Sequence, residues 1–268
     1  MATYRSLLFA PANRPHRFDR AKGSGADAVC LDLEDAVPPC DKAEARSQAA
    51  AFLAQAAGRG PAVGVRINAR GSNWHVEDLA AVAAFADFIM LPKANTPADV
   101  RALAEAAPNR PIWPLIETAD GVRHAWDIAA ESRVAGVLFG AFDYAADVGC
   151  TLAWEPLLYA RGRLAAACAR ARIELLNAPS GDLNDLEALS AGARLSQALG
   201  FTGRACIHPD QVRAVNAVFT PTPSEVATAK RVLAAYEAAG EGVAQLDGRL
   251  IERPVALAAR RVLARAGG

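Results

Sequence analysis

Two short apolar runs in the middle of the chain are each followed by a carboxylate. The run 112–116 leads directly to Glu117, and the run 134–139 comes shortly before Asp143. An apolar run without polar alternation is typical of a parallel strand that is buried on both faces. The carboxyl ends of such strands meet at one edge of a sheet. Glu117 and Asp143 are therefore expected to share a site.

The other apolar runs of the chain also end on polar side chains. These are Asn13, Arg14, Asp32, Glu34, Asp35, Arg66, Asn68, Lys93, Ser180, Asp182 and His208. The set is rich in carboxylates and cations and poor in imidazoles and thiols. Oxygen ligands of this kind favour a hard divalent cation, Mg²⁺ over Zn²⁺. His208 is expected in the wall of the pocket, because no second histidine stands near it.

Several carboxylates at one edge of a sheet need a counter-charge. Two of them 4 Å apart would repel by roughly 4 kcal/mol at an effective dielectric constant near 20. Mg²⁺ takes one or two protein carboxylates and fills its other positions with water and substrate. We predict Glu117 and Asp143 as its ligands, with Glu34 and Asp35 holding metal-bound waters or Arg14. The alternative is that these acids are helix N-caps or ion-pair partners.

Arg66 follows the third apolar run and has two possible roles. Its planar guanidinium suits a substrate carboxylate or an enolate oxygen. It could instead form a structural ion pair with Glu34 or Asp35. The sequence leaves both readings open.

The apolar runs alternate with Ala-rich helical patterns, which predicts the α/β class. The eight runs are 6–12, 28–34, 62–68, 88–93, 111–117, 134–140, 173–179 and 202–208. Eight βα units in 268 residues favour a (β/α)₈ TIM barrel over a doubly wound sheet.

Two more helical patterns follow the eighth run, at about 223–240 and 254–266, with the polar turn QLDGRLIERP between them. Since a barrel needs one closing helix, the last helix is surplus. We predict a barrel over 1–222 and a C-terminal helical extension over 223–268, which packs on the barrel or on a neighbouring subunit.

The composition excludes some classes of partner. Lys+Arg and Asp+Glu both number 29, so no net field favours a nucleic acid or a membrane surface. The five cysteines lack C-x-x-C spacing, which disfavours a disulfide framework or a zinc site. The apolar core near the N-terminus is too short for a signal peptide. A reduced, cytoplasmic location is expected.

Several motifs in this order resemble a known family. They are RSLLFAPANRPHRFDRA, GADAVCLDLEDAVPPCDKAEAR, VRIN, MLPK, PLIETADGV, LFGAFDYAADVG and GFTGRACIHPDQV. Over about residues 4–218 the chain resembles the citrate lyase beta subunit-like branch of the HpcH/HpaI aldolase family. The resemblance implies a (β/α)₈ barrel, a homotrimer or homohexamer, and Mg²⁺ held by Glu117 and Asp143. It also matches Arg66 to the substrate-binding arginine of the family, and Arg14 and Lys93 are added as substrate-binding candidates.

The activity that the resemblance implies is that of a carbon–carbon lyase. Its substrate would be a 3-hydroxy-acid thioester such as citryl-, malyl- or citramalyl-CoA, and its products an acyl-thioester and a 2-oxoacid. One alternative is a beta subunit that acts on an acyl-carrier-protein thioester within a larger lyase complex. Another is a non-catalytic barrel that binds metal and ligand.

The sequence departs from its relatives at two positions. Asn95 stands where many relatives have a Glu, and Glu252 stands where related CoA lyases carry an Asp that transfers a proton across the subunit interface. The longer side chain moves the carboxyl by more than an angstrom, and a shift of that size can cost about 10²-fold in rate. Glu252 is either a catalytic variant or the salt-bridge partner of Arg249 or Arg253.

Overall fold

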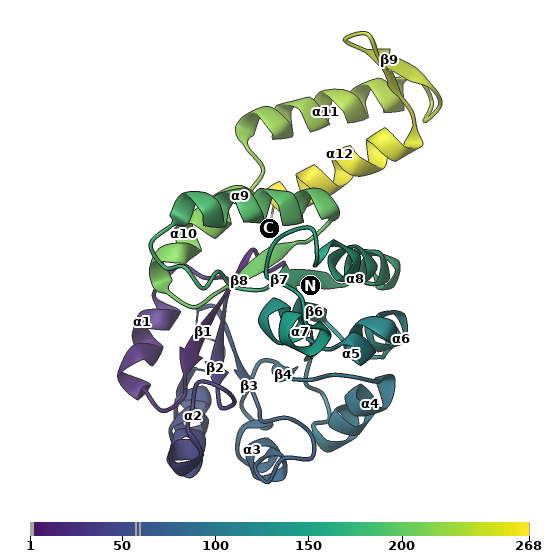
Figure 1. Cartoon of the computed structure of the whole chain (residues 1–268). Coiled ribbons are helices and arrows are strands. Elements are labelled where there is room, and N and C mark those ends of the chain that lie inside the picture. The colour runs from purple at the N-terminus through teal and green to yellow at the C-terminus, as the bar shows by residue number, and fades with distance from the viewer. Residues whose placement is uncertain (1–2, 57, 59, 268) are drawn as a thin grey trace. The chain divides into compact units, whose positions relative to one another are not determined.

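A closed barrel of eight parallel strands forms the larger part of the molecule (Figure 1). The computed structural model describes residues 3–56, 58 and 60–267. The strands are β1 (Ser6–Pro11), β2 (Ala28–Asp32), β3 (Ala62–Arg66), β4 (Ile89–Leu91), β5 (Ile112–Ile116), β6 (Gly136–Phe139), β7 (Glu174–Asn177) and β8 (Gly203–Cys206). They pair in chain order, and β8 pairs with β1 to close the barrel. The predicted TIM barrel is confirmed.

Each strand is shorter than the apolar run that predicted it. β2, β5 and β6 are buried along their whole length, as expected for parallel strands covered on both faces. The last residues of each run lie beyond the strand and lead into the loop to the next helix, as Glu34 does after β2. These shortened ends are where the candidate site residues lie.

Large aromatic side chains fill the inside of the barrel. Tyr4 stacks on Trp113 with ring centroids 5.5 Å apart, and Phe88 lies 6.1 Å from the same ring. Two strand glycines make the room: a methyl group at Gly64 would lie 2.3 Å from the Phe88 ring, and one at Gly136 2.5 Å from the Trp113 ring. The buried core includes Leu7, Ala28, Cys30, Phe88, Met90, Trp113, Leu115, Leu138, Leu176 and Ala205.

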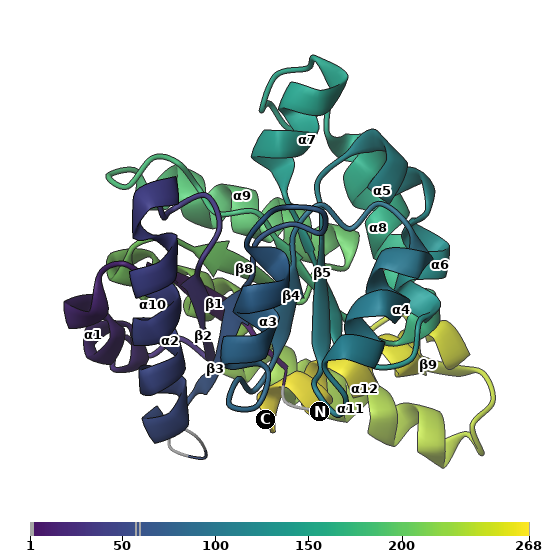
Figure 2. The same cartoon turned by 90° about the horizontal axis from the view of Figure 1, so that it is seen from below.

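Helices surround the strands (Figure 2). They are η1 (Pro15–Arg17), α1 (Phe18–Lys22), η2 (Pro39–Asp41), α2 (Lys42–Ala56), α3 (His75–Val82), α4 (Pro97–Ala106), α5 (Ala119–Arg123), α6 (Ala125–Ala130), α7 (Ala141–Val148), α8 (Leu158–Ala171), α9 (Leu186–Leu199) and α10 (Pro209–Phe219). Helix α4 begins with Pro97 in its first turn and with Asp99 accepting hydrogen bonds from Thr96.

The helix that follows β8 is α10, which corrects one expectation from the sequence. The sequence pattern predicts that one of the two C-terminal helices closes the barrel. Instead α10 follows β8, and Asn216 near its end donates a hydrogen bond to the Gly25 carbonyl, 2.9 Å away. Both C-terminal helices are therefore additional to the eight βα units.

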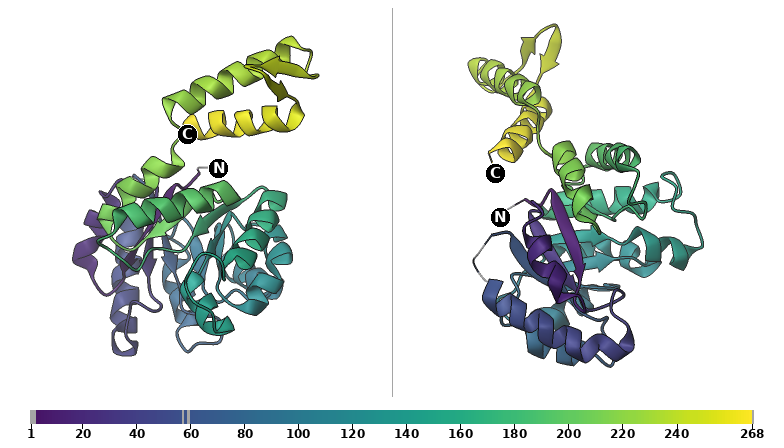
Figure 3. Two further views of the ribbon diagram at one scale, coloured as in Figure 1. Left: turned by 45° about the horizontal axis from the view of Figure 1, so that its top comes forward. Right: turned by 90° about the vertical axis from the view of Figure 1, so that its left-hand side faces the viewer.

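The C-terminal residues form a second compact unit with its own core. It contains α11 (Pro223–Ala238), a hairpin of β9 (Ala244–Leu246) and β10 (Arg249–Ile251), and α12 (Arg253–Ala266). The hairpin joins two helices that lie side by side (Figure 3). Its core consists of Ala229, Val232, Tyr236, Ile251, Ala256 and Ala259.

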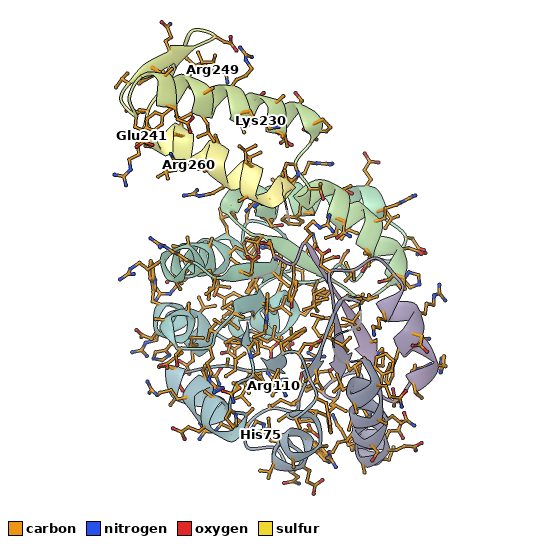
Figure 4. All side chains as sticks on the ribbon, turned by 180° about the vertical axis from the view of Figure 1, so that it is seen from behind. His75, Arg110, Lys230, Glu241, Arg249 and Arg260 are labelled. Carbon is orange, nitrogen blue, oxygen red and sulfur yellow. The ribbon has the colours of Figure 1, made fainter. Side chains whose placement is uncertain are left out.

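Surface ion pairs also link parts of this unit. Arg260 on α12 pairs with Glu241 at 3.1 Å (Figure 4). The sequence predicted both helices and read the hairpin as a polar turn. The packing of 223–268 on the barrel or on a neighbouring subunit stays a prediction. None of the helices in the described residues has both the length and the apolar character needed to span a membrane.

Candidate metal and substrate site

A cavity of about 570 Å³ opens at the carboxyl ends of the barrel strands. Its charged lining comes from η1, the ends of β2 and β3, the loop after β2, the residue after β5 and the first turn of α7. These charged residues include Asp32, Asp35, Arg66, Glu117 and Asp143. The two predicted metal ligands therefore line one cavity, together with the predicted substrate-binding arginine.

Glu117 is held in place from two sides. It follows β5 and is 1% exposed, and its Oε1 accepts a hydrogen bond of 2.8 Å from the backbone N–H of Lys93. On its other side a Cβ at Gly140 would lie 2.5 Å from the Cβ of Glu117 and 2.6 Å from its Oε2. The absence of a side chain at Gly140 thus lets the strand β6 pass close to the Glu117 carboxyl.

The surroundings of Glu117 carry excess negative charge. Burial raises the pKa of Glu117 to about 8, and the nearby Glu34 and Asp143 carboxylates add to the shift, whereas Lys93 opposes it. Such a group is costly to ionise unless a cation lies beside it. The two oxygen-donor side chains Glu117 and Asp143 fit Mg²⁺, which usually takes one or two protein carboxylates. Within the described ranges, no group of three or more His, Cys, Asp or Glu side chains is arranged to hold a metal ion.

Arg66 is fixed mainly by Asp32. Its Nε and Nη2 donate to the two Asp32 oxygens at 2.7 and 2.5 Å, and its Nη1 lies 3.0 Å from Glu34. The guanidinium also lies over the Phe9 ring, 5.2 Å from its centroid. Burial alone would lower the pKa of Arg66, but Asp32 and then Glu34 raise it above its ordinary value. The arginine is charged and held in one orientation.

Asp32 is a site residue with no role predicted from the sequence. It is 3% exposed and accepts the two hydrogen bonds from the Arg66 side chain. It also accepts hydrogen bonds from the backbone N–H of Glu34 at 2.9 Å and of Ala36 at 3.3 Å. A signal was present in the strand register: Asp32 and Arg66 end β2 and β3 as direct Cα partners. Opposite charges at the ends of adjacent parallel strands are placed to pair.

Glu34 and Lys93 form a second ion pair at this edge. Lys93 Nζ donates to Glu34 Oε1 at 2.7 Å. Burial raises the pKa of Glu34, although Arg66 and Lys93 both oppose the shift. The loop that carries Glu34 is itself held by buried Lys42, whose Nζ donates to the Leu33 and Glu34 carbonyls, each at 2.7 Å. Lys42 is another residue that the sequence did not single out.

The remaining predicted residues lie in different surroundings. Asp35 is exposed and lines the cavity, 3.6 Å from Arg66. Arg14 is exposed just before η1 and is outside the cavity lining, whereas Arg17 lines it. Glu252 is exposed, precedes α12 in the second unit, and is not among the residues that line this cavity.

Asn95, the other departure from the relatives, has a structural partner. Its Oδ1 accepts a hydrogen bond of 2.5 Å from the Thr118 hydroxyl, and Thr118 caps α5 by accepting from the Gly121 N–H at 3.0 Å. Asn95 therefore helps to fix the start of the helix that follows Glu117.

Comparison with known proteins agrees with this fold. The sequence profile of the family described as HpcH/HpaI aldolase/citrate lyase matches residues 5–209. This chain belongs to that family. A second profile, described as C-C bond lyase of the TIM-barrel fold, matches residues 166–267.

Relatives within the HpcH/HpaI family are similar over most of their length. A (3S)-malyl-CoA thioesterase of Cereibacter sphaeroides is 36% identical over 98% of this chain and 94% of its own. An L-malyl-CoA/beta-methylmalyl-CoA lyase of the same species is 36% identical over 92% of this chain and 90% of its own. The crystal structure of CitE from Mycobacterium tuberculosis in complex with magnesium, acetoacetate and coenzyme A is 35% identical, with a TM-score of 0.85 over 100% of this chain and 99% of that one.

Proposed function

We propose that this protein is a Mg²⁺-dependent carbon–carbon lyase that cleaves, or forms, a 3-hydroxy-acid CoA thioester. The products of cleavage are an acyl-CoA and a 2-oxoacid. The observation that carries the proposal is the meeting of Glu117, Asp143 and Arg66 in one cavity of a family member. The malyl-CoA lyase relative and the CitE complex with magnesium and coenzyme A support the substrate class and the metal.

Glu117 and Asp143 would hold the Mg²⁺. Bound there, Mg²⁺ supplies a Lewis acid for the oxygen of the 2-oxoacid portion. The raised pKa of Glu117 reflects burial and like charge that a divalent cation would relieve. Arg66, which is held by Asp32, lines the same cavity as these two ligands.

Arg66 would stabilise the negative charge that grows on the departing enolate. Its Nε and Nη2 donate to Asp32, and its Nη1 is paired with Glu34 at 3.0 Å. Because Nη1 carries two N–H groups, the one not directed at Glu34 would donate to a substrate oxygen. A donor held in one orientation before the reaction is worth most where charge develops. Glu34 and Asp35 lie 3.0 and 3.6 Å from Arg66 and would position it. They stay our candidates for holding metal-bound waters. Arg14 and Lys93 stay our candidates for binding the substrate.

Cleavage also needs two proton movements. The hydroxyl of the substrate loses its proton as the carbon–carbon bond breaks, and the thioester enolate takes a proton on carbon. We propose Glu252 of a neighbouring subunit as the acid that moves one of these protons. The motivation is its place in Gly248-Arg249-Leu250-Ile251-Glu252-Arg253-Pro254, which resembles the segment that carries this acid in related lyases.

A direct assay tests the proposed reaction. Purified protein with Mg²⁺ is incubated with citryl-, malyl- and citramalyl-CoA, and 2-oxoacid release is followed with a coupled dehydrogenase. We expect 2-oxoacid from at least one thioester and no increase in free thiol, because cleavage leaves the acyl-CoA thioester intact. If none of the three is cleaved while Mg²⁺ binding is demonstrable, the lyase proposal is wrong and a non-catalytic barrel is favoured.

Thioester hydrolysis is a second candidate activity. The observation in its favour is the 36% identity to a (3S)-malyl-CoA thioesterase over 98% of this chain. Hydrolysis releases free coenzyme A, so a thiol reagent separates it from cleavage in the same assay. Co-purification with partner subunits, together with turnover of an acyl-carrier-protein thioester, would favour the beta-subunit role.

We further propose a homotrimer or homohexamer located in the cytoplasm. The additional C-terminal unit supports the assembly, because it offers a surface beyond the eight βα units. A CoA-thioester substrate and the absence of C-x-x-C pairs support a reduced compartment. Light scattering after gel filtration measures the assembly, and a monomer at working concentration would contradict it.

A further inference from the structure

A second cavity, of about 310 Å³, lies beside the first one. Phe142, Ala178, Pro179 and Gly181 line both cavities. The second cavity differs in its charge, because two arginines, Arg161 and Arg204, are among its lining residues. The proposed lyase reaction makes no use of either arginine.

The two arginines come from different elements, Arg161 from α8 and Arg204 from β8. Asn177 on β7 and Arg204 on β8 are Cα partners in the sheet. Their neighbours Leu176 and Ala205 belong to the core inside the barrel, so Asn177 and Arg204 point outward, toward the layer of helices. Arg161 lies on α8, which packs against β6 and β7 in that layer (Figure 1).

Both guanidinium groups are poorly supplied with partners. Arg161 is 7% exposed, and its Nη1 donates to the Trp154 carbonyl at 3.1 Å. Its guanidinium lies 4.3 Å from the Trp154 ring centroid and 5.8 Å from the Phe139 ring centroid. Arg204 donates from Nη1 to the Leu189 carbonyl at 3.4 Å. The Nε atoms of both arginines are buried without a hydrogen-bond partner among the described residues.

The positive charge of this pair has no ion-pair partner in the part of the chain that the structure describes. Among the ion pairs of the described residues, none involves Arg161 or Arg204. Asp182 lines the same cavity, but its Oδ1 accepts from the backbone N–H of Asn184 at 2.8 Å. Burial, and then Arg204, lower the pKa of Arg161 to about 10, with no carboxylate opposing the shift. Two like charges beside a cavity form a site that an anion would complete.

We propose that this cavity binds a small oxyanion, a carboxylate or an inorganic phosphate, between Arg161 and Arg204. The planar donors of two arginines match the geometry of such an anion, and the side-chain N–H₂ of Asn177 is placed to add a further donor. The anion has two possible sources: a carboxylate arm of the thioester substrate, reaching past the shared wall, or free phosphate. Only the first source depends on the proposed lyase function.

Titration calorimetry in a chloride-free buffer of low ionic strength tests the binding. The probes are inorganic phosphate and succinate, and the proteins are the parent, Arg161→Gln, Arg204→Gln and the control Arg170→Gln. Arg170 is exposed on the same helix and is not part of the cavity lining. We expect Arg161→Gln and Arg204→Gln each to weaken anion binding by about tenfold or more, because each loses a charge-assisted hydrogen bond, and Arg170→Gln to bind like the parent.

A further variant separates loss of the anion site from loss of folding. Asn177→Asp introduces a carboxylate beside Arg204, so it should abolish binding of both anions while raising the Tm. Absence of binding by the parent at tens of millimolar anion, or parent-like binding by Arg161→Gln and Arg204→Gln, overturns the proposal.

Steady-state kinetics with the Arg161→Gln variant distinguishes the two sources. A KM that rises only for thioesters with an additional carboxylate identifies the substrate arm. An unchanged KM, together with lost phosphate binding, identifies free phosphate.

Discussion

Glu117 is the residue whose surroundings say most about the metal. It is buried beside two other acids, and its pKa is raised to about 8 by burial first and by Glu34 and Asp143 in addition. A carboxylate in such a position is costly for the apo protein, because desolvation and like charge both oppose ionisation. A cation bound beside Glu117 favours the ionised carboxylate and offsets both effects. The burial and the neighbouring acids that raise the pKa of Glu117 therefore also favour binding of Mg²⁺.

Replacing the two proposed ligands should abolish tight Mg²⁺ binding. We expect Glu117→Gln and Asp143→Asn each to weaken the affinity for Mg²⁺ by at least about tenfold, since each removes one charged oxygen ligand and leaves the fold intact. Calorimetric titration of the apo protein with Mg²⁺ measures the change. The control is Asp120→Asn, an exposed acid in α5 that does not line the cavity. Parent-like affinity in both ligand variants would show that the metal lies elsewhere.

The residues that the sequence failed to single out act through other side chains. Glu117, Asp143 and Arg66 could be proposed because each follows an apolar run and has a type that suits catalysis. Asp32 and Lys42 hold such residues in place. Asp32 accepts hydrogen bonds from the Arg66 guanidinium, and Lys42 donates to backbone carbonyls of the loop that carries Glu34. Their roles depend on strand register and on the path of a loop, neither of which a linear pattern gives.

The elements of the barrel bring these residues together through close backbone packing. β5 and β6 are neighbours, and the Glu117 carboxyl occupies the space that a side chain at Gly140 would need. Eight apolar runs predicted eight strands because continuous hydrophobicity is a strong signal for buried parallel strands. The extra hairpin β9–β10 was missed because it is short and partly exposed, which leaves no such signal.

A methyl group at position 140 should therefore disturb the metal site. In Gly140→Ala the new Cβ would lie 2.5 Å from the Glu117 Cβ, so Glu117 or β6 must shift. We expect a lower Tm, with a loss of about 1–3 kcal/mol in the free energy of unfolding, and a weaker affinity for Mg²⁺.

A second glycine supplies the control for that prediction. In Gly162→Ala, on α8, nothing lies within 4 Å of the new methyl group. This change should raise the free energy of unfolding by about 0.5–1 kcal/mol, because Ala favours the helix more than Gly does. Thermal unfolding and Mg²⁺ titration measure both variants. Equal stability of the two would contradict the packing argument.

The start of α4 should make stability depend on pH. Burial of Asp99 works against ionisation, but hydrogen bonds from Arg70 and Thr96 outweigh it and lower the pKa of Asp99. A carboxyl with a lowered pKa stabilises the fold at pH values above its unfolded pKa of about 3.9, and this contribution is lost as the pH falls through the folded value.

Asp99→Asn mimics the protonated acid and tests this cap. We expect it to lower the free energy of unfolding by about 1 kcal/mol at pH 7, and the difference from the parent to shrink as the pH falls below about 4 and through the lowered pKa of Asp99. Glu105→Gln is the control, since Glu105 lies exposed on the same helix. Urea unfolding at several pH values measures both. A difference that does not change with pH would exclude the charged cap as its cause.

At the scale of the whole molecule the chain is divided into two compact units. The barrel carries every residue that lines the metal cavity, whereas the C-terminal unit carries Glu252 and buries its own small core of Ala229, Val232 and their neighbours. The sequence predicted the existence of extra helices because their periodicity is local. Their binding partner could not be predicted, because a surplus apolar face identifies no particular surface to cover it.

Mixing two inactive variants tests whether Glu252 acts on a neighbouring subunit. Glu117→Gln lacks a metal ligand and Glu252→Gln lacks the proposed acid, so each alone should show little 2-oxoacid release. In a cyclic assembly formed from equal amounts of both, about a quarter of the sites combine an intact Glu117 with an intact Glu252 from the next subunit. We therefore expect the co-expressed mixture to recover activity in that proportion.

The alternatives for Glu252 give different results in the same experiment. If Glu252 serves the site of its own chain, no mixed assembly contains an intact site, and the mixture stays inactive. If it only pairs with Arg249 or Arg253, Glu252→Gln alone keeps most of the parent activity, because an exposed salt bridge contributes little. Recovery of activity on mixing thus requires both an oligomer and a site that is completed by two subunits. Neither variant alone contains such a site.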